Sequence, residues 1–573
     1  MTTQAVDPCP APVPMADIVP GLVGEGLTVV KGTTPQPFRV EVLGVLKDGI
    51  GAGRDMVMIE VSDLQGQQVV GDNGIWAGMS GSPVYVNGKL LGAISYGFTY
   101  SPSPIGGLTP ATDMMALLGS SSQSDQAKAA SRLRTKVTLS ASQRKALDVR
   151  ADATLPRTSL QRLRTPMSVS GLNGKRLSSL QGAFDRAGRP VITYAGSRAS
   201  AVGSAAAAPV PGGNFAAVLT YGDLTLAGVG TTTAVCGSQV LAFGHPMDFA
   251  GKVSYGANAA TSLAIVKDNT DGSFKMANVG GTFGTVDQDR LAAIRATLGK
   301  GPTTTPITSK ITNLDNKKSR TGTTQVAAPD YTAAATVYGL WANYDSTFDK
   351  WGKGLATSSW RIQGTRARGK AFTVARSNMW SDLGDPTIDP AFEVAYAVDS
   401  LLSNEFEPVK ITGVSFNSSL TSAFERYRIT DMAVSVNGGK YKSASVIKVK
   451  PKAKLKVRVT MRGYQSSVDR QVVLKLKVAK RYAKQTGTLT VQGGLDAAND
   501  DFDTSCLLTD CDESDGGLNA VIAGITSPPA NNAVRADLDF NENAEGEFSA
   551  DAKTSAAAPV SGSESIVIKV KKK

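Results

Sequence analysis

The chain has 573 residues, which is more than one ordinary core holds and predicts two to four domains. Hydrophobic residues make up 41%, charged residues 19%, and there are 59 glycines, so a turn-rich globular protein with many strands is expected. The net charge of +12 is spread along the chain, which favours an anionic cell-wall environment and disfavours nucleic acid. The longest uncharged stretch, between Arg198 and Asp223, is broken by Pro209 and Pro211 and predicts no transmembrane segment.

Residues 15–120 are predicted to form one half of a β structure. Short apolar or alternating runs lie between glycine and proline turns at residues 27–30, 38–45, 56–61, 83–86 and 90–94. Asn87-Gly88 stands between the last two runs, which is a strong signal for a two-residue hairpin. A short helix is expected after Thr109-Pro110, ending near Gly119.

The middle of the chain changes character twice. Residues 121–165 are rich in Ser, Ala and Arg and are interpreted as a connector with a helix at 141–149; residues 198–213 are interpreted as a surface loop. Residues 166–325 are predicted as a second β half, with strands strongest at 216–220, 225–227 and 239–243. A helix is expected over Asp289–Leu298, closed by Gly299.

The last third is again predicted to be rich in strands. Residues 326–404 are expected to hold strands and one helix, which begins at Pro390. Residues 446–459 then alternate Val, Ile or Leu with lysine, a pattern typical of strands with one buried and one solvated face. Such a charged face also discourages edge-to-edge pairing. The sequence therefore predicts a separate β-sandwich-like domain over residues 405–573.

The cysteines and acidic residues show no zinc signature, and no metal or other cofactor is expected. Cys506 and Cys511 suit a small disulfide hairpin, while Cys9 and Cys236 could pair across the fold or stay free. The acidic stretch around Cys506 and Cys511 could bind calcium. A solvated acidic loop is favoured, because the spacing of its carboxylates does not match a calcium-binding loop. The first residues lack a charged segment followed by an apolar core, so a signal peptide has been removed or the start lies inside the true one.

A candidate nucleophile lies in Gly78-Met-Ser80-Gly-Ser82-Pro, between a strand and the predicted hairpin. A serine hydroxyl needs a base and a cradle for the oxyanion that its attack generates. Glycines around Ser80 would allow a tight turn in which the amides of Gly78 and Ser80 form that oxyanion hole. A plain Gly-Ser turn is the competing interpretation, since such turns are common in β proteins.

The candidate base is His245, the single histidine of the chain. It lies in Phe243-Gly-His-Pro246, directly after an apolar strand, and turns at strand ends often present catalytic residues. A lone histidine is ordinarily structural. If Ser80 is activated by a histidine, however, no other histidine can serve.

These segments resemble the stage IV sporulation protein B peptidases, a family of the chymotrypsin-like clan. The resemblance covers roughly residues 15–300. It is carried by the segments at 74–94, 32–33, 42–45, 106–110, 243–246, 274–278 and 284–290. It implies a double β-barrel, serine endopeptidase activity, and catalytic roles for Ser80 and His245.

Two features differ from the sporulation peptidase itself. Here the serine precedes the histidine, as if the two barrels were circularly permuted, and no PDZ pattern is found. Triad chemistry depends on geometry and not on chain order, so the order is compatible with activity. The acid that orients the histidine is expected to be Asp63, narrowly ahead of Asp72 and Asp248, and Asp287 and Asp289 also follow the histidine.

The sequence thus predicts a secreted or cell-surface serine endopeptidase that acts on proteins or peptides through an acyl-enzyme. Self-cleavage in the linkers at 120–165 and 198–213 is a further expectation. The alternative is a non-catalytic exported binding or scaffold protein on a peptidase fold.

Overall fold

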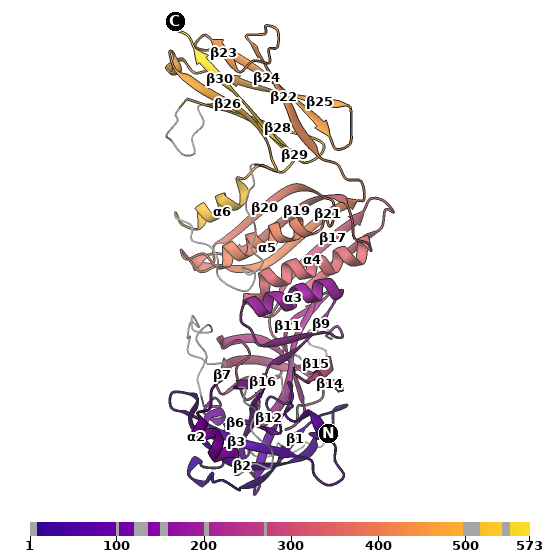
Figure 1. The fold of residues 1–573 in the computed structure, drawn as a ribbon, viewed down its shortest axis with the longest axis vertical. Helices are drawn as coiled ribbons and strands as arrows, with labels where there is room; N and C mark the ends of the chain where they lie inside the picture. Colours follow the sequence, from indigo (N-terminus) through magenta and orange to yellow (C-terminus); the bar gives the residue numbers. More distant parts are fainter. Residues whose placement is uncertain are drawn as a thin grey trace. The chain divides into compact units, whose positions relative to one another are not determined.

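The computed structural model describes residues 9–98, 102–119, 136–148, 159–199, 206–268, 272–496, 516–540 and 550–572 (Figure 1). The fold is mostly β, as predicted. Two compact units divide the chain: the first takes in Met1–Pro306 and Thr323–Ala342, and the second takes in Ile307–Gly322 and nearly all residues from Asn343 to Lys573. None of the helices in the described residues is long and apolar enough to cross a membrane.

Six antiparallel strands of the first unit close into a barrel that carries Ser80, here named the serine barrel. Their hydrogen-bonded order is β4-β1-β2-β3-β6-β5, and β4 also pairs with β5 and closes the ring. The predicted hairpin joins β4 to β5, with Asn87 and Gly88 at φ 49° and 72°, as a type I′ turn requires. The strands are β1 (Val23–Thr28), β2 (Gln36–Gly51), β3 (Arg54–Ser62), β4 (Pro83–Val86), β5 (Lys89–Phe98) and β6 (Ile105–Pro110).

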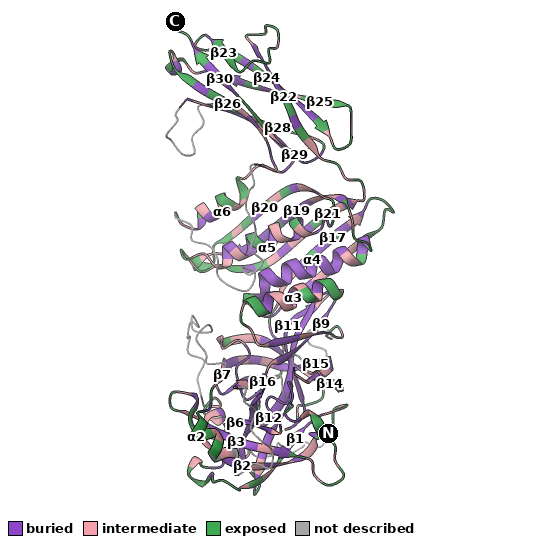
Figure 2. Cartoon of the chain, viewed as in Figure 1, coloured by how far each residue is buried: buried purple, intermediate pink, exposed green. Residues whose placement is uncertain are grey.

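A second ring of six antiparallel strands carries His245 and is named the histidine barrel. Its order is β12-β13-β16-β15-β14-β11, and β11 pairs with β12 to close it. Nearly every residue of β12 is buried (Figure 2). The strands are β11 (Asn214–Gly222), β12 (Thr225–Cys236), β13 (Gln239–Ala242), β14 (Gly251–Val266), β15 (Phe274–Arg290) and β16 (Ala293–Leu298). The chain thus has the chymotrypsin-like double barrel, with the serine half first.

Shorter elements flank the two barrels. The predicted helices after Pro110 and at 141–149 are present as α1 (Ala111–Met115) and α2 (Ala141–Asp148). Strands β7 (Lys136–Val137) and β8 (Leu160–Arg162) extend the serine sheet beyond β5. The parallel pair β9 (Thr165–Ser170) and β10 (Val191–Ala195) extends the histidine sheet from β12, joined by the unpredicted helix α3 (Gly174–Arg186).

The helix predicted over Asp289–Leu298 is wrong. This segment holds the end of β15, a turn, and β16, which pairs with β13 on one side and β15 on the other. Alanine and leucine favour a helix locally, but two neighbouring strands supply a complete ladder of hydrogen bonds, and tertiary pairing overrides propensity. Residues 293–296 of β16 are buried between these two neighbouring strands.

Residues 305–421 are divided between the two units and hold more helix than predicted. β17 (Thr305–Asn313) pairs in parallel with β21 (Lys410–Thr421), followed by β19 (Gly354–Thr365) and β20 (Ala371–Asp382). β18 (Ser319–Val326) precedes helix α4 (Thr332–Phe348), most of which belongs to the first unit, and α5 (Ile388–Leu402) is the predicted helix. The expectation of one helix in residues 326–404 is therefore wrong. α4 is apolar nearly all round, so its sequence lacks the polar stripe by which a helix is recognised.

A β-sandwich follows in the second unit. One sheet has the order β25-β24-β22-β29 and the other β23-β30-β26-β27-β28, and one apolar cluster lies between them. The predicted boundary at residue 405 falls before β21, which belongs to the preceding sheet. Its strands are β22 (Tyr427–Val436), β23 (Val446–Val449), β24 (Lys454–Gly463), β25 (Asp469–Lys477), β26 (Thr486–Gly493), β27 (Ala533–Asp539), β28 (Ala550–Ser555), β29 (Val560–Ser561) and β30 (Ser563–Val570). Helix α6 (Leu518–Thr526), between β26 and β27 in the chain, contacts α5 and β20 instead.

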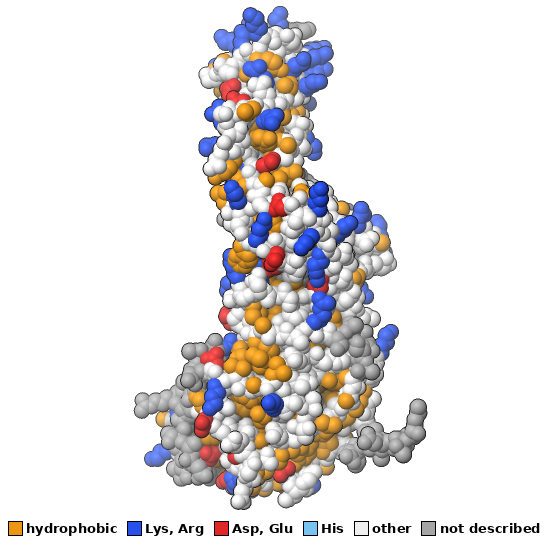
Figure 3. All heavy atoms as spheres, turned by 90° about the vertical axis from the view of Figure 1, so that its right-hand side faces the viewer, with side chains coloured by type: hydrophobic (Ala, Val, Ile, Leu, Met, Phe, Trp, Pro, Cys, Tyr) orange, Lys and Arg blue, Asp and Glu red, His pale blue; other side chains and the backbone are white. Residues whose placement is uncertain are grey.

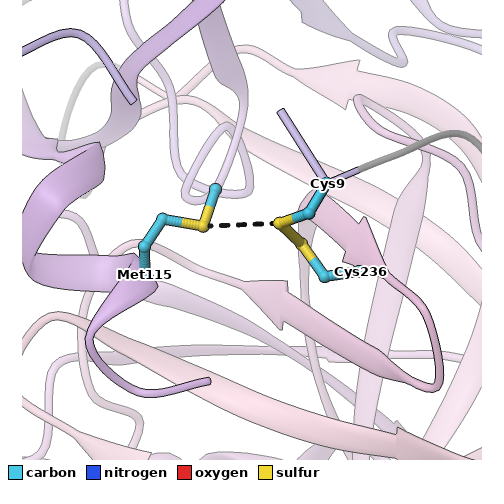
Figure 4. Close-up of a disulfide and its surroundings, with 3 residues drawn as sticks. All are labelled: Cys9, Met115 and Cys236. Carbon is cyan, nitrogen blue, oxygen red and sulfur yellow. Dashed lines mark hydrogen bonds between the residues drawn. A yellow bond between two sulfur atoms is a disulfide. The ribbon is translucent and has the colours of Figure 1, made fainter. Parts of the chain in front are cut away.

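A disulfide joins Cys9 to Cys236 at the end of β12 (Figure 4). The sulfur of Met115, at the end of α1, lies 3.8 Å from Sγ of Cys9. Of the two alternatives for this pair, the structure thus shows the bonded one. Cys506 and Cys511, and the acidic stretch around them, lie outside the described residues apart from Asp496.

Candidate active site

The serine segment, residues Gly78–Ser82, makes a tight turn before β4. Gly78 and Gly81 have φ values of 100° and 92°, which only glycine adopts without strain. A Cβ on Gly81 would lie 2.1 Å from the carbonyl oxygen of Thr231 and 2.4 Å from the amide nitrogen of Phe243. The second glycine is therefore required because the backbone of the histidine barrel passes directly against it.

Two threonines of β12 hold the serine segment from the other barrel. The amide of Thr231 donates to the carbonyl of Ser80 over 2.8 Å, and its hydroxyl donates to the carbonyl of Gly78 over 2.9 Å. The hydroxyl of Thr233 donates to the carbonyl of Gly81 over 2.7 Å. Three carbonyl groups of the segment are therefore fixed by β12.

Two of these amides have no hydrogen-bond acceptor within the described part of the chain: those of Gly78 and Ser80. The intervening amide of Met79 donates to the carbonyl of Trp76, and that of Gly81 donates to Ile94. Buried amides without acceptors are rare in folded proteins. These are the two amides that the sequence predicted for an oxyanion hole, and both are left available to a further acceptor.

His245 lies in a strained turn after β13. Phe243 and Gly244 both adopt left-handed backbone conformations, with φ of 70° and 67°, and this is costly for a bulky aromatic residue. The turn is held by Thr109 of the serine barrel, whose hydroxyl donates to the carbonyl of Gly244 over 2.6 Å. The ring of Phe243 also packs edge-on against Phe215. Each barrel therefore holds the functional segment of the other.

The two candidate catalytic side chains meet. Nε2 of His245 lies 2.8 Å from Oγ of Ser80, and Nδ1 lies 2.8 Å from the carbonyl oxygen of Pro246. Because a carbonyl can only accept, Nδ1 of the neutral ring carries the hydrogen and Nε2 is left with its lone pair. Ser80 then donates to Nε2, which is the tautomer that a general base needs. In triads a carboxylate selects this tautomer, whereas here a backbone carbonyl does so.

Burial keeps this histidine neutral. The pKa of His245 is lowered to about 3, chiefly because burial disfavours the imidazolium and secondly because the positive Arg162 is nearby; the bond to Pro246 opposes the shift. His245 is fully buried and Ser80 is 2% exposed. Arg162 is itself buried, and its Nε has no hydrogen-bond partner among the described residues. The site thus favours the state that accepts a proton but stabilises the protonated ring poorly.

The carboxylates expected beside the histidine are used elsewhere. Asp63 accepts hydrogen bonds from the amides of Val69, Val70 and Gly71 over 2.7 to 2.9 Å, so it stabilises its own loop. The side chain of Asp72 is 95% exposed, and Lys267 lies 3.6 Å away. Neither is a hydrogen-bond partner of His245 in the structure.

Asp248 is also committed to other groups. It forms an ion pair with Arg189 and accepts from the hydroxyl of Tyr331 over 3.0 Å. Asp287 pairs with Arg295 over 2.9 Å. Neither carboxylate is a hydrogen-bond partner of His245 in the structure.

Asp289 instead organises the turn that follows the histidine. Its carboxylate accepts from the amides of Met247 and Asp248 over 2.8 and 2.7 Å, and more weakly from Ala250 over 3.4 Å. The residue is fully buried; burial first and the charge of Asp248 second raise its pKa to about 6, against the lowering effect of the three amides. Among the acids that follow the histidine in the sequence, this one is a positioning group.

A buried lysine borders the serine segment. Nζ of Lys275 lies 2.9 Å from Oδ1 of Asn214 and 3.5 Å from Oγ1 of Thr231, and 5.3 Å from the ring of Trp76. A Cβ on Gly78 would lie 2.7 Å from its Cβ. The side chain is fully buried, and burial lowers its pKa to about 7. Sequence reasoning placed residue 275 in a family segment but assigned it no role.

A pocket opens beside the serine segment. Its apolar lining includes Ile75, Ala77, Leu163 and Ile192, and its polar rim includes Arg164. Ala77 directly precedes Gly78, so a side chain bound here would lie next to the segment that carries the nucleophile. No group of three or more His, Cys, Asp or Glu residues that could hold a metal ion occurs within the described ranges.

The comparison with protein families agrees with the resemblance noted above. The family described as SpoIVB peptidase S55 matches residues 5–114, which contain the serine segment and all six strands of the serine barrel. No curated protein and no solved structure matches the chain. Residues 5–114 are thus similar to the SpoIVB peptidase S55 family, which supports the resemblance predicted from the sequence.

Proposed function

We propose that the chain is a serine endopeptidase with Ser80 as nucleophile and His245 as general base. The observation that carries the proposal is the 2.8 Å contact between Oγ of Ser80 and Nε2 of His245, in a tautomer fixed by the carbonyl of Pro246. His245 takes the hydroxyl proton as Ser80 attacks a peptide carbonyl. The amides of Gly78 and Ser80 hold the oxyanion, and the protonated ring then gives its proton to the leaving amine.

This chemistry proceeds without a carboxylate on the histidine. The imidazolium formed in the transition state is stabilised by one carbonyl, so the rate is expected to fall well below that of a full triad. The apolar pocket beside Ala77 supports binding of an apolar substrate side chain. Because this pocket lies next to the serine segment, we expect it to bind the substrate side chain nearest to the cleaved bond.

The same proposal includes export and self-processing. The disulfide between Cys9 and Cys236 supports an oxidising compartment, and the net charge of +12 suits contact with anionic cell-wall polymers. Cleavage within residues 120–165 or 198–213 would appear as new N-termini when the purified protein is sequenced.

A fluorophosphonate probe tests the active-site assignment. The wild-type chain is expected to label at Ser80, and Ser80→Ala and His245→Ala are expected to lose labelling by at least about a thousandfold, as for removal of a triad member. Ser82→Ala is the matched control, because Ser82 lies two residues away in the same segment and is fully buried. Labelling that survives in Ser80→Ala, or that is lost equally in Ser82→Ala, contradicts the assignment.

A non-catalytic scaffold is the second candidate. The complete burial of His245 and the lack of a carboxylate partner for its ring favour it. Hydrolysis of casein separates the two functions: the peptidase predicts turnover by the wild type and none by His245→Ala, and the scaffold predicts none by either.

A further inference from the structure

One face of the C-terminal sandwich carries lysines that oppose each other. On the antiparallel strands β24 and β25, Lys454 lies opposite Lys477 and Lys456 lies opposite Lys475. Buried residues, including Leu455, Leu474 and Leu476, alternate with these lysines along the two strands. The four lysines therefore share the solvent-facing side. We name these four residues the lysine face.

Like charges directly opposite each other destabilise a strand pair. None of the four ammonium groups has an ion-pair or hydrogen-bond partner within the described residues. At the other end of the same hairpin, residues of opposite charge face each other. Arg462 lies opposite Asp469 and forms an ion pair of 3.0 Å. The lysine face therefore departs from the pattern of its own hairpin at a cost in stability.

Protection of a sheet edge does not account for this arrangement. β25 is the edge strand of its sheet, and lysines there discourage pairing with another chain. β24, however, lies between β25 and β22, so Lys454 and Lys456 protect no edge. Arg458, the next residue on the same side of β24, stacks on the ring of Tyr441 at 4.5 Å and continues the row of positive charge.

We propose that the lysine face binds a flexible linear polymer that carries repeated phosphate charges. Lysines two apart on a strand repeat about every 6.8 Å, and opposite residues lie about 5 Å apart, so the face presents two short parallel rows of charge. Ammonium groups act as point charges without a fixed geometry, which suits repeated phosphates better than one specific anionic group. Figure 3 shows Lys and Arg side chains gathered on the sandwich with few Asp and Glu side chains among them. Bound phosphates would relieve the repulsion between the opposed lysines.

Binding of long-chain inorganic polyphosphate to the full chain tests the proposal. Lys475→Gln combined with Lys477→Gln is expected to weaken binding about tenfold and to reduce the slope of log K against log salt by about 1.4, because two phosphate contacts are lost. The combined change Lys317→Gln and Lys318→Gln is the matched control, since it removes the same charge from an exposed turn between β17 and β18. It should leave both quantities nearly unchanged.

Two further arms identify the partner. Duplex DNA and phosphatidylglycerol vesicles are expected to bind more weakly than polyphosphate, because neither a rigid rod nor a flat surface follows two short rows of charge. Equal weakening by the control variant overturns the proposal, as does tighter binding of DNA or vesicles. The Lys475 and Lys477 variant should also keep or raise the thermal midpoint, because it removes like-charge repulsion.

Discussion

The serine segment and the histidine turn are held in different ways. Neutral groups of the opposite barrel hold the serine segment: the hydroxyls of Thr231 and Thr233 and the close backbone passage at Gly81. The histidine turn also has one such contact, from Thr109, but its further half depends on the carboxylate of Asp289. The serine segment is therefore placed by neutral hydrogen bonds and close backbone packing, and the histidine turn partly by a buried carboxylate.

The two segments should therefore be sensitive to different substitutions. The serine segment should be displaced when a side chain is added at Gly81, whereas the histidine turn should be displaced when the acceptor oxygens of Asp289 are removed. Each substitution can be made and measured separately.

Gly81→Ala should have the largest effect. Its Cβ would meet backbone atoms at 2.1 and 2.4 Å, which no side-chain movement relieves, so we expect a loss of unfolding free energy of more than about 4 kcal/mol and loss of labelling. Gly88→Ala is the control: its φ of 72° is also left-handed but nothing lies within 4 Å, so about 1 kcal/mol is expected. Equal losses in urea unfolding would show that the two barrels do not meet closely at Gly81.

Asp289→Asn should have the next largest effect. An amide group replaces one acceptor oxygen and faces the amides of Met247 or Asp248, which costs about 2 to 3 kcal/mol and displaces His245. We expect slower fluorophosphonate labelling as well as lower stability.

Asp63→Asn is its matched control. Asp63 also accepts from three loop amides, but these lie in the serine barrel, so the change should lower stability while labelling of Ser80 persists. Loss of labelling in Asp63→Asn would restore this residue as the acid of a triad.

The sequence could predict that Ser80 and His245 meet because the signals at each residue are local. Glycines that frame Ser80 and a glycine–proline turn at His245 are visible as motifs, and so is the Asn87-Gly88 hairpin. The partner of the histidine could not be found in this way. Every residue type has a backbone carbonyl, so the sequence does not show which one contacts the histidine. The sequence pointed instead to the carboxylates of Asp63, Asp72 and Asp248, whose partners lie elsewhere in the fold.

Longer-range features were hidden for similar reasons. Thr231 and Thr233 stand in an ordinary run of threonines within β12, and only the meeting of the barrels gives them the carbonyls of Gly78 and Gly81. The segment at 289–298 has local helix propensity, which its two neighbouring strands override. Buried threonines in a strand are the one signal that could have drawn attention to β12.

Lys275→Met should have the smallest effect on unfolding free energy. It also tests whether the serine segment is held by neutral contacts alone, because Lys275 is a titratable group beside that segment. Its pKa is about 7 in the folded chain and near 10.5 in the unfolded one, so between pH 7 and 9 the unfolded state binds more protons. Unfolding free energy should therefore rise with pH, by about 2 kcal/mol over this range, and the methionine variant should lose that rise because it has no amine to titrate. Urea unfolding of both proteins at pH 7, 8 and 9 measures the difference. Parallel curves would mean that the amine stays protonated when buried and that the serine segment, like the histidine turn, depends on a charge.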